Sequence, residues 1–128
     1  MDLIKQIEIN IWGRDFNLPV KYRCYHNGEV SETQVDALKN LVSDRERIDY
    51  SKNYVVEYCE HDVLQDDEND KKDNIFSYIM PEYIFVDEND EGPNVAFMCK
   101  YRYDLEHGLA VVFSYDGDTF ICIQDDIL

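Results

Sequence analysis

Four short apolar runs separated by turn sequences occupy the C-terminal part of the chain and constrain its fold most strongly. The runs are residues 83–86, 95–103, 109–115 and 119–123, and the turns are 88–93, 104–108 and 116–117. Short strands joined by short turns favour antiparallel neighbours, because a tight turn returns the chain beside the strand it has just left. We therefore expect a four-strand meander over 83–123, with Phe85, Phe97, Val112 and Phe113 contributing to burial.

The two faces of this meander follow from strand alternation. Val111 and Phe113 should lie on one face of the sheet and Val112 on the other. Because all three are apolar, at least one face needs a covering helix.

Alternation also marks the start of the chain. Residues 7–11 alternate apolar and polar, 12–15 read as a turn, and 16–25 alternate again. We expect these segments to pair as a hairpin. Pro19 has no N–H, so it should lie at the start or the edge of its strand. One face of the second strand collects Leu18, Val20, Tyr22 and Cys24.

The next segment predicts a helix over 32–43. Ser31 followed three residues later by Gln34 matches a capping box, and Glu32 places negative charge in the first turn. Val35, Leu38, Leu41 and Val42 share one face, so the helix can lie on a sheet.

A second helix over 52–65 is less determined by its sequence. Ser51 fits an N-cap, and Val55, Cys59 and Val63 recur at helical spacing. The β-branched and aromatic residues of 54–58 suit a strand equally, so both alternatives stay open.

Together these elements predict an α+β fold in one domain spanning 1–128. It consists of an antiparallel sheet, made of the N-terminal hairpin and the C-terminal meander, with one or two helices packed on it. Residues 65–74 contain no apolar side chain and read as a polar, acidic loop.

The charge of the chain limits its partners. Its 128 residues include 28 Asp and Glu against 12 Lys and Arg, a formal net charge of −16. Such a surface repels nucleic acid phosphates and anionic lipids, whereas it attracts a basic protein. No apolar run approaches the about 20 residues that cross a bilayer, and no secretory signal begins the chain. We therefore expect a cytoplasmic protein that binds neither nucleic acid nor membrane.

Metal and cofactor motifs are not evident. Cys24, Cys59, Cys99 and Cys122 are widely spaced, so we expect four reduced thiols. The repeated Cys-x-His at 24–26 and 59–61 lacks the spacing of zinc ligands. A calcium loop starting at Asp87 would end at Met98, where a bidentate Glu is needed. We expect no metal and no cofactor.

Asp104, Glu106 and His107 form the densest cluster of acid and base groups. A histidine beside carboxylates can act as a general base near neutral pH. However, the chain lacks a nucleophile-elbow or zinc-protease motif. The simpler interpretation is a structural turn, in which Asp104, Glu106 and His107 precede Gly108 and this glycine supplies a special backbone conformation.

The same segment, residues 101–113, resembles the signature of an uncharacterised bacterial domain family. In that family an aromatic-Asp-x-Glu-His-Gly-Leu turn precedes a strand, and a Gln-Asp pair, here 124–125, follows near the C-terminus. Pro81 before the apolar run 83–86 is similar too, so the resemblance covers about residues 80–126. It implies small α+β proteins without established enzymatic activity. Some resemble, in size and acidity, immunity proteins that neutralise polymorphic or contact-dependent toxins.

We therefore expect a non-enzymatic immunity protein that occludes the basic surface of a toxin domain. The expected contacts are the acidic residues Asp66, Asp67, Glu68 and Asp70 of the loop, with Glu57, Glu60 and Asp62 of the second helix. A solvated spacer is the alternative for the loop. For the whole chain, the alternatives are a small enzyme using Asp104, Glu106 and His107, or an adaptor of another partner.

Overall fold

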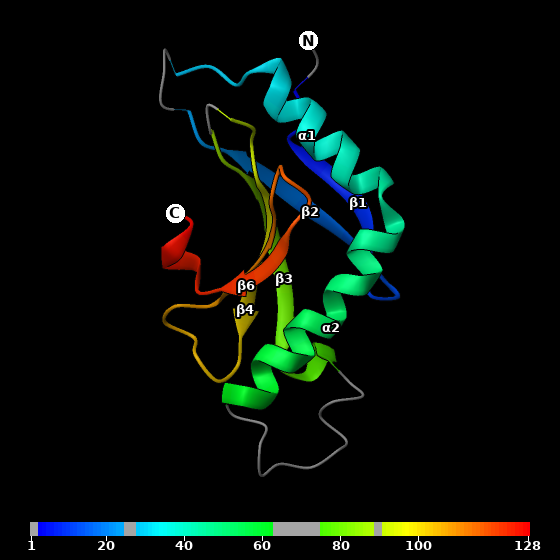
Figure 1. Cartoon of the computed structure of the whole chain (residues 1–128), viewed down its shortest axis with the longest axis vertical. Helices are drawn as coiled ribbons and strands as arrows, with labels where there is room; N and C mark the ends of the chain where they lie inside the picture. The colour runs from blue at the N-terminus through cyan, green and yellow to red at the C-terminus, as the bar shows by residue number, and fades with distance from the viewer. Residues whose placement is uncertain (1–2, 25–27, 63–74, 89–90) are drawn as a thin grey trace.

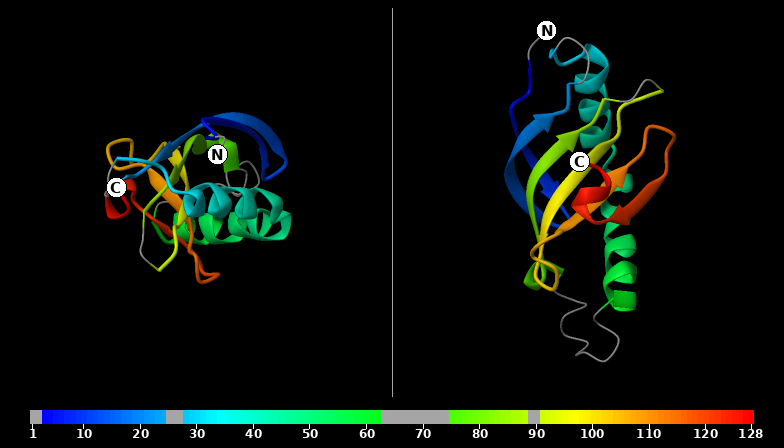
Figure 2. Two further views of the ribbon diagram at one scale, coloured as in Figure 1. Left: turned by 90° about the horizontal axis from the view of Figure 1, so that it is seen from above. Right: turned by 90° about the vertical axis from the view of Figure 1, so that its left-hand side faces the viewer.

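The computed structural model describes residues 3–24, 28–62, 75–88 and 91–128, with the side chains of 60–62 excepted. It is an α+β fold in which two helices cover one face of a six-strand sheet that does not close (Figures 1 and 2). The strands are β1 (Gln6–Ile11), β2 (Arg14–Tyr22), β3 (Ile79–Val86), β4 (Val95–Tyr101), β5 (Leu109–Phe113) and β6 (Thr119–Cys122). The helices are α1 (Glu32–Ser43) and α2 (Arg45–Asp62), with short 3-10 turns η2 (Ile75–Ser77) and η3 (Gln124–Asp126).

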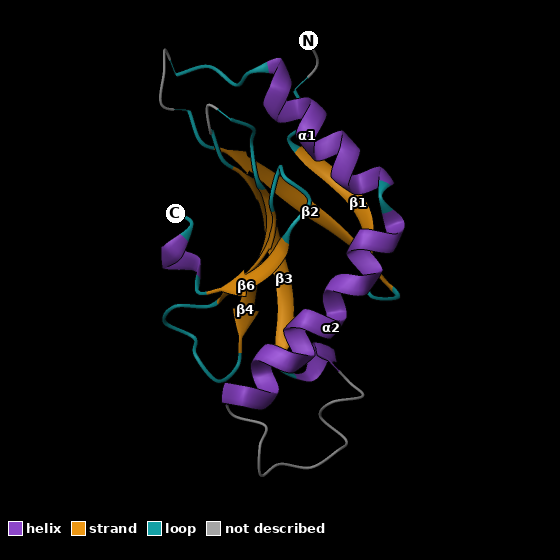
Figure 3. Cartoon of the chain, viewed as in Figure 1, coloured by secondary structure: helices purple, strands orange, loops and turns teal. Residues whose placement is uncertain are grey.

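The strands follow one another across the sheet in chain order, β1 to β6 (Figure 3). The hairpin β1–β2 and the meander β3–β6 are antiparallel, as predicted. A parallel pairing of β2 with β3, from Val20 beside Ile84 to Tyr22 beside Val86, joins the two parts. Two parallel neighbouring strands need a long connection between them. The connection from β2 to β3 contains both helices.

Two prolines, Pro81 and Pro19, lie inside strands, so their predicted positions before a strand and at a strand start or edge are wrong. β3 begins at Ile79 and contains Pro81, where a register shift before Tyr83 accommodates the missing N–H. Pro19 lies inside β2, which is not an edge strand. It pairs with Gln6 of β1, but the pairing of β2 with β3 starts only at Val20. The missing N–H of Pro19 therefore costs no bond to β3.

Helix α1 has its predicted limits and cap. The Ser31 hydroxyl accepts from the Gln34 N–H at 3.2 Å, and the Gln34 side chain accepts from the Ser31 N–H at 2.9 Å. Gln34 is fully buried, and its amide donates to the carbonyl oxygens of Arg23 and Asp87. The cap therefore also fixes α1 to the ends of β2 and β3.

Helix α2 begins at Arg45, so the predicted start at 52 with Ser51 as N-cap is wrong. Asp44 stands at the helix start instead, and its carboxylate accepts from the Arg47 N–H at 3.3 Å. Ser51 is fully buried within the helix and accepts from the indole N–H of Trp12 at 3.0 Å. The helical alternative for 54–58 is the correct one, because Val55 is buried in the core between helix and sheet. Val63 and the rest of 63–65 lie outside the described residues.

The core has two parts, one on each face of the sheet. Val111 and Phe113 pack in the larger part with helix residues such as Leu38 and Val55. Val112 lies in the smaller part on the other face, as alternation predicts. Ile127 packs there, and the C-terminal segment lies on the side of the sheet opposite the helices (Figure 1).

Candidate functional site

The β4–β5 turn holds the acid–base cluster singled out from the sequence. The Asp104 carboxylate accepts from the His107 N–H at 3.2 Å, and the Asp104 carbonyl oxygen accepts from the Gly108 N–H at 2.9 Å. Gly108 has a φ of +62°, which glycine adopts without steric cost. Asp104 therefore closes this turn through both its side chain and its backbone.

Gln124 of η3 fastens the C-terminal segment to the same turn. Its backbone N–H donates to the His107 carbonyl oxygen at 3.1 Å, and its side-chain amide donates to the Cys99 carbonyl oxygen at 2.9 Å. A Cβ at position 108 would lie 2.6 Å from Nε2 of Gln124. The turn and the Gln-Asp pair of the sequence motif thus form one hydrogen-bonded unit.

The His107 ring lies between two carboxylates. Nδ1 is 3.0 Å from one oxygen of Asp104, and Nε2 is 4.0 Å from an oxygen of Asp125. The hydrogen bond to Asp104 and its negative charge raise the pKa of His107, and Glu106 and Asp125 add to the effect. Since 39% of the side chain is exposed, solvent screens much of this interaction.

The chemistry available to this cluster is limited. The imidazole and Asp104 could exchange a proton, and partial exposure leaves the ring accessible. Glu106 is exposed and makes no hydrogen bond within the described part of the chain. Asp104 and His107 serve the turn geometry, so they are positioned first of all as structural residues.

The acidic residues predicted to bind a partner are only partly placed. Asp66, Asp67, Glu68 and Asp70 lie outside the described residues. Glu60 and Asp62 belong to the last turn of α2, and only their backbone is described. Glu57 is exposed on α2.

Sequence reasoning missed an exposed pair of tyrosines on α2. Tyr50 is 60% exposed and Tyr54 38% exposed, and their ring centroids lie 5.5 Å apart at an interplanar angle of 70°. The two rings border a hollow of about 470 Å³ between α2 and the β5–β6 turn, here called the tyrosine groove. Its lining residues are Asp44, Glu46, Arg47, Tyr50, Tyr54, Gly117, Asp118 and Thr119.

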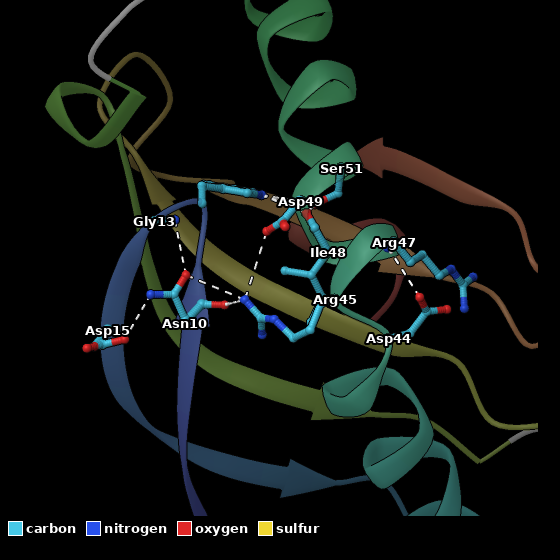
Figure 4. A network of polar contacts seen from close by, with 10 residues as sticks. Asn10, Gly13, Asp15, Asp44, Arg45, Arg47, Ile48, Asp49 and Ser51 are labelled. Atoms are coloured by element: carbon cyan, nitrogen blue, oxygen red, sulfur yellow. Dashed lines mark hydrogen bonds and ion pairs between the residues drawn. The ribbon is translucent and has the colours of Figure 1, made fainter.

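The two arginines at the start of α2, Arg45 and Arg47, bind backbone groups of other elements of the protein. Arg47 donates to the carbonyl oxygens of Ser114 and Asp118, both at 2.8 Å, and its guanidinium lies 5.4 Å from the Phe113 ring centroid. Arg45 donates to the Asn10 carbonyl oxygen at 2.6 Å (Figure 4). These contacts hold α2 against β1 and the β5–β6 turn.

Two carboxylates of the tyrosine groove are not engaged in this way. The side chains of Glu46 and Asp118 form no ion pair or hydrogen bond with any other described residue, and both residues are exposed. The groove therefore presents negative charge beside exposed aromatic rings.

A signal for the tyrosine pair exists in the sequence. Ile48, Ser51, Val55 and Cys59 are the buried positions of α2. Tyr50 and Tyr54, spaced four apart, fall on the opposite face, together with Glu46 and Glu57. This pattern appears only if the helix is extended back to residue 45.

Within the described ranges, no three or more His, Cys, Asp or Glu side chains are grouped to hold a metal ion. All four cysteines are free, as expected. None of the described helices combines the length and apolar character needed to cross a membrane.

An open six-strand sheet with a helical pair on one face thus defines the chain as an α+β protein. It belongs to the family described as a domain of unknown function (DUF6985), which it matches over residues 3–125. The match includes the N-terminal half, which the motif of 101–113 alone did not assign to a family. Neither the curated proteins nor the solved structures contain a significant match to the chain.

Proposed function

We propose that this protein is a non-enzymatic acidic binding protein whose partner is a basic protein, and that this partner is a bacterial toxin domain that it neutralises by occlusion. The observation that carries the proposal is the tyrosine groove, where exposed aromatic rings lie beside Glu46 and Asp118, whose carboxylates have no partner among the described residues. Tyrosine is enriched among the residues that dominate binding energy at protein interfaces.

The net charge supports the same partner class. A formal charge of −16 accelerates encounter with a basic surface, by roughly 10- to 1,000-fold at low salt. Nucleases need basic clefts to hold phosphates, so an acidic inhibitor can cover such a cleft in place of the substrate. A nuclease toxin is therefore the preferred partner.

The test is co-expression of the chain with a toxin domain encoded directly beside its gene. We expect the chain to restore growth of cells that produce the toxin. In surface-based kinetics, the association rate should fall by at least about 10-fold from low to high salt, because salt screens steering. Absence of rescue, or an association rate independent of salt, would contradict the proposal.

Two charge variants separate the candidate surfaces. One replaces Asp66, Asp67, Glu68 and Asp70 by Asn or Gln, and the other changes Glu46 and Glu57 to Gln. Whichever acidic surface contacts the toxin, its variant should associate at least about 10-fold more slowly at low salt. Because Glu46 and Glu57 are exposed, the α2 variant should keep its fold. Unchanged association of the loop variant would make the loop a solvated spacer.

A second candidate function, a small enzyme, depends on one observation. The half-exposed His107 ring between Asp104 and Asp125 can take up and release a proton. In this case His107→Ala would abolish a measurable turnover while leaving stability unchanged. An adaptor for another basic partner would bind without rescuing growth.

A further inference from the structure

We propose that the tyrosine groove is a receptor for an arginine side chain presented by the partner. This inference rests on the proposed function and names the chemical group that the same surface recognises. It combines the tyrosine rings, the carboxylates that line the same hollow, and the volume of this hollow.

The two rings supply a surface for a flat cation. Tyr50 and Tyr54 are one helical turn apart and meet edge to face, so the face of one ring is directed toward the edge of the other. The high exposure of Tyr50 leaves ring surface accessible to a partner. A guanidinium can stack on an exposed ring face, where the ring quadrupole attracts it.

Carboxylates from two elements line the tyrosine groove together with the rings. Glu46 precedes Tyr50 by one turn of α2, and Asp118 belongs to the β5–β6 turn. With Asp44, the groove has three carboxylates against one guanidinium, that of Arg47. The Arg47 guanidinium donates its hydrogen bonds to carbonyl oxygens and not to these carboxylates. The negative charge of the carboxylates is therefore available to an incoming cation.

The protein's own Arg47 illustrates the kind of contact expected. Its guanidinium combines a ring, that of Phe113, with oxygen acceptors at 2.8 Å. The tyrosine groove offers the same combination of an aromatic ring and oxygen acceptors, with carboxylates in place of carbonyl groups. Arginine suits it better than lysine, because a planar guanidinium can stack and bind a carboxylate with two parallel hydrogen bonds.

The size of the groove fits a side chain carried by a larger partner. Its volume of about 470 Å³ lies within the usual range of ligand pockets, roughly 300–1,000 Å³. A second hollow of about 300 Å³ adjoins it, shares Asp44 and Arg47, and adds Asp36 and Tyr115. A basic segment with more than one cation could therefore extend from one hollow into the next.

The test uses two synthetic peptides, acetyl-Gly-Arg-Gly-Arg-Gly-Arg-Gly-amide and its lysine counterpart, titrated into the full chain and followed by NMR. The arginine peptide should bind about three- to fivefold more tightly than the lysine peptide, because a planar guanidinium stacks on an exposed ring more favourably than a hydrated ammonium does. Amide shifts should concentrate on α2 and the β5–β6 turn.

Variants with matched controls identify the site. Tyr50→Leu with Tyr54→Leu keeps the charge and should abolish the arginine preference, whereas Phe120→Leu, 47% exposed on β6, should retain it. Glu46→Gln should weaken binding at least about threefold more than Glu29→Gln, which removes the same charge elsewhere. Both tyrosines are exposed, and thermal melting checks that the double variant is folded.

Each outcome has a distinct meaning. Equal binding of the two peptides, or an arginine preference that survives in the tyrosine variant, would overturn the receptor proposal. If the tyrosine variant loses the preference but the wild-type chain fails to neutralise the toxin, the immunity function fails and the receptor stands. If the tyrosine variant neutralises the toxin as well as the wild-type chain does, the groove is not the receptor at that interface, and the immunity function is unaffected.

Discussion

The side-chain amide of Gln124 donates to the carbonyl oxygen of Cys99 at 2.9 Å, across a space that only a glycine at position 108 leaves open. This bond connects the end of β4 with η3, two segments far apart in the chain. It is a direct physical link between the turn at 104–108 and the Gln near the C-terminus.

Gly108→Ala should lower the free energy of unfolding more than Gly28→Ala does. Both glycines have left-handed φ angles, +62° and +70°, so both variants pay a backbone cost of about 1–2 kcal/mol. Only the Cβ at 108 meets other atoms, Nε2 of Gln124 at 2.6 Å and the Cys99 oxygen at 2.9 Å. Urea denaturation measures both variants. Equal losses would show that the close approach is without energetic consequence.

Gln124→Ala should cost about 0.5–1.5 kcal/mol through the lost hydrogen bond to Cys99. It also removes the atoms nearest to a new Cβ at 108. The double variant with Gly108→Ala should therefore lose less stability than the sum of the single variants. A double-mutant cycle in urea measures this coupling, and strict additivity would contradict the shared contact.

The pKa of His107 should be above its ordinary value of 6.5, because Asp104 hydrogen-bonds to the ring and carries negative charge. The folded state then binds the proton more tightly than the unfolded state. The resulting stabilisation is fully present below pH 6.5 and is lost as the pH rises through the raised pKa. An NMR titration of the ring should therefore have its midpoint above 6.5.

Asp104→Asn should lower this midpoint and flatten the corresponding part of the stability–pH curve. Glu29→Gln, which removes a charge elsewhere, is the control and should leave the midpoint nearly unchanged. A wild-type midpoint at or below 6.5 would refute the interaction.

Local sequence signals predicted local structure well in this protein. The α1 cap succeeds because Ser31 and Gln34 bond to each other within one turn. The parallel pairing of β2 and β3 has no such signal, since Val20 and Ile84 are brought together only by the packing of the whole crossover. The sequence thus predicted the hairpin, the meander and one sheet containing both, but the expectation that this sheet is antiparallel throughout is wrong at the β2–β3 pair.

The candidate site likewise has one part that the sequence predicted and one part that it did not. The turn at 104–108 was found because its hydrogen bonds are between near neighbours. The tyrosine groove was missed because Ser51, a favourable cap residue, suggested a helix start about two turns too late. Its hydroxyl is instead used by Trp12, a partner from the distant hairpin turn.

Ser51→Ala should lower the free energy of unfolding by about 0.5–1.5 kcal/mol, since the buried indole N–H of Trp12 loses its 3.0 Å acceptor. The Ile48 carbonyl oxygen, 3.2 Å away, remains as a weaker acceptor. Ser43→Ala removes an exposed hydroxyl from α1 and should change stability by less than about 0.5 kcal/mol. Fluorescence of Trp12, the only tryptophan, follows both denaturation curves. Equal effects would contradict a structural role for the Trp12–Ser51 bond.

The four cysteines should all be reduced but should react in a defined order. Denatured protein should titrate as four thiols, because all four are free in the structure. In the native state, Cys59 and Cys99 are fully buried, so they should be labelled only on unfolding. Burial and the charge of Asp126 raise the pKa of Cys122 to about 11, which leaves little thiolate at pH 8.

Cys24 should therefore be the first thiol labelled in native protein at pH 8. Cys24 and Cys122 are both half-buried, but the raised pKa of Cys122 leaves that residue little reactive thiolate at pH 8. Cys24→Ser should remove the fastest phase of a thiol-exchange reaction, whereas Cys122→Ser should leave that phase intact. Raising the pH toward 11 should accelerate Cys122, since the thiolate is the reactive form. Labelling of Cys99 before Cys24, or fewer than four thiols in denatured protein, would contradict the buried and reduced state of these cysteines.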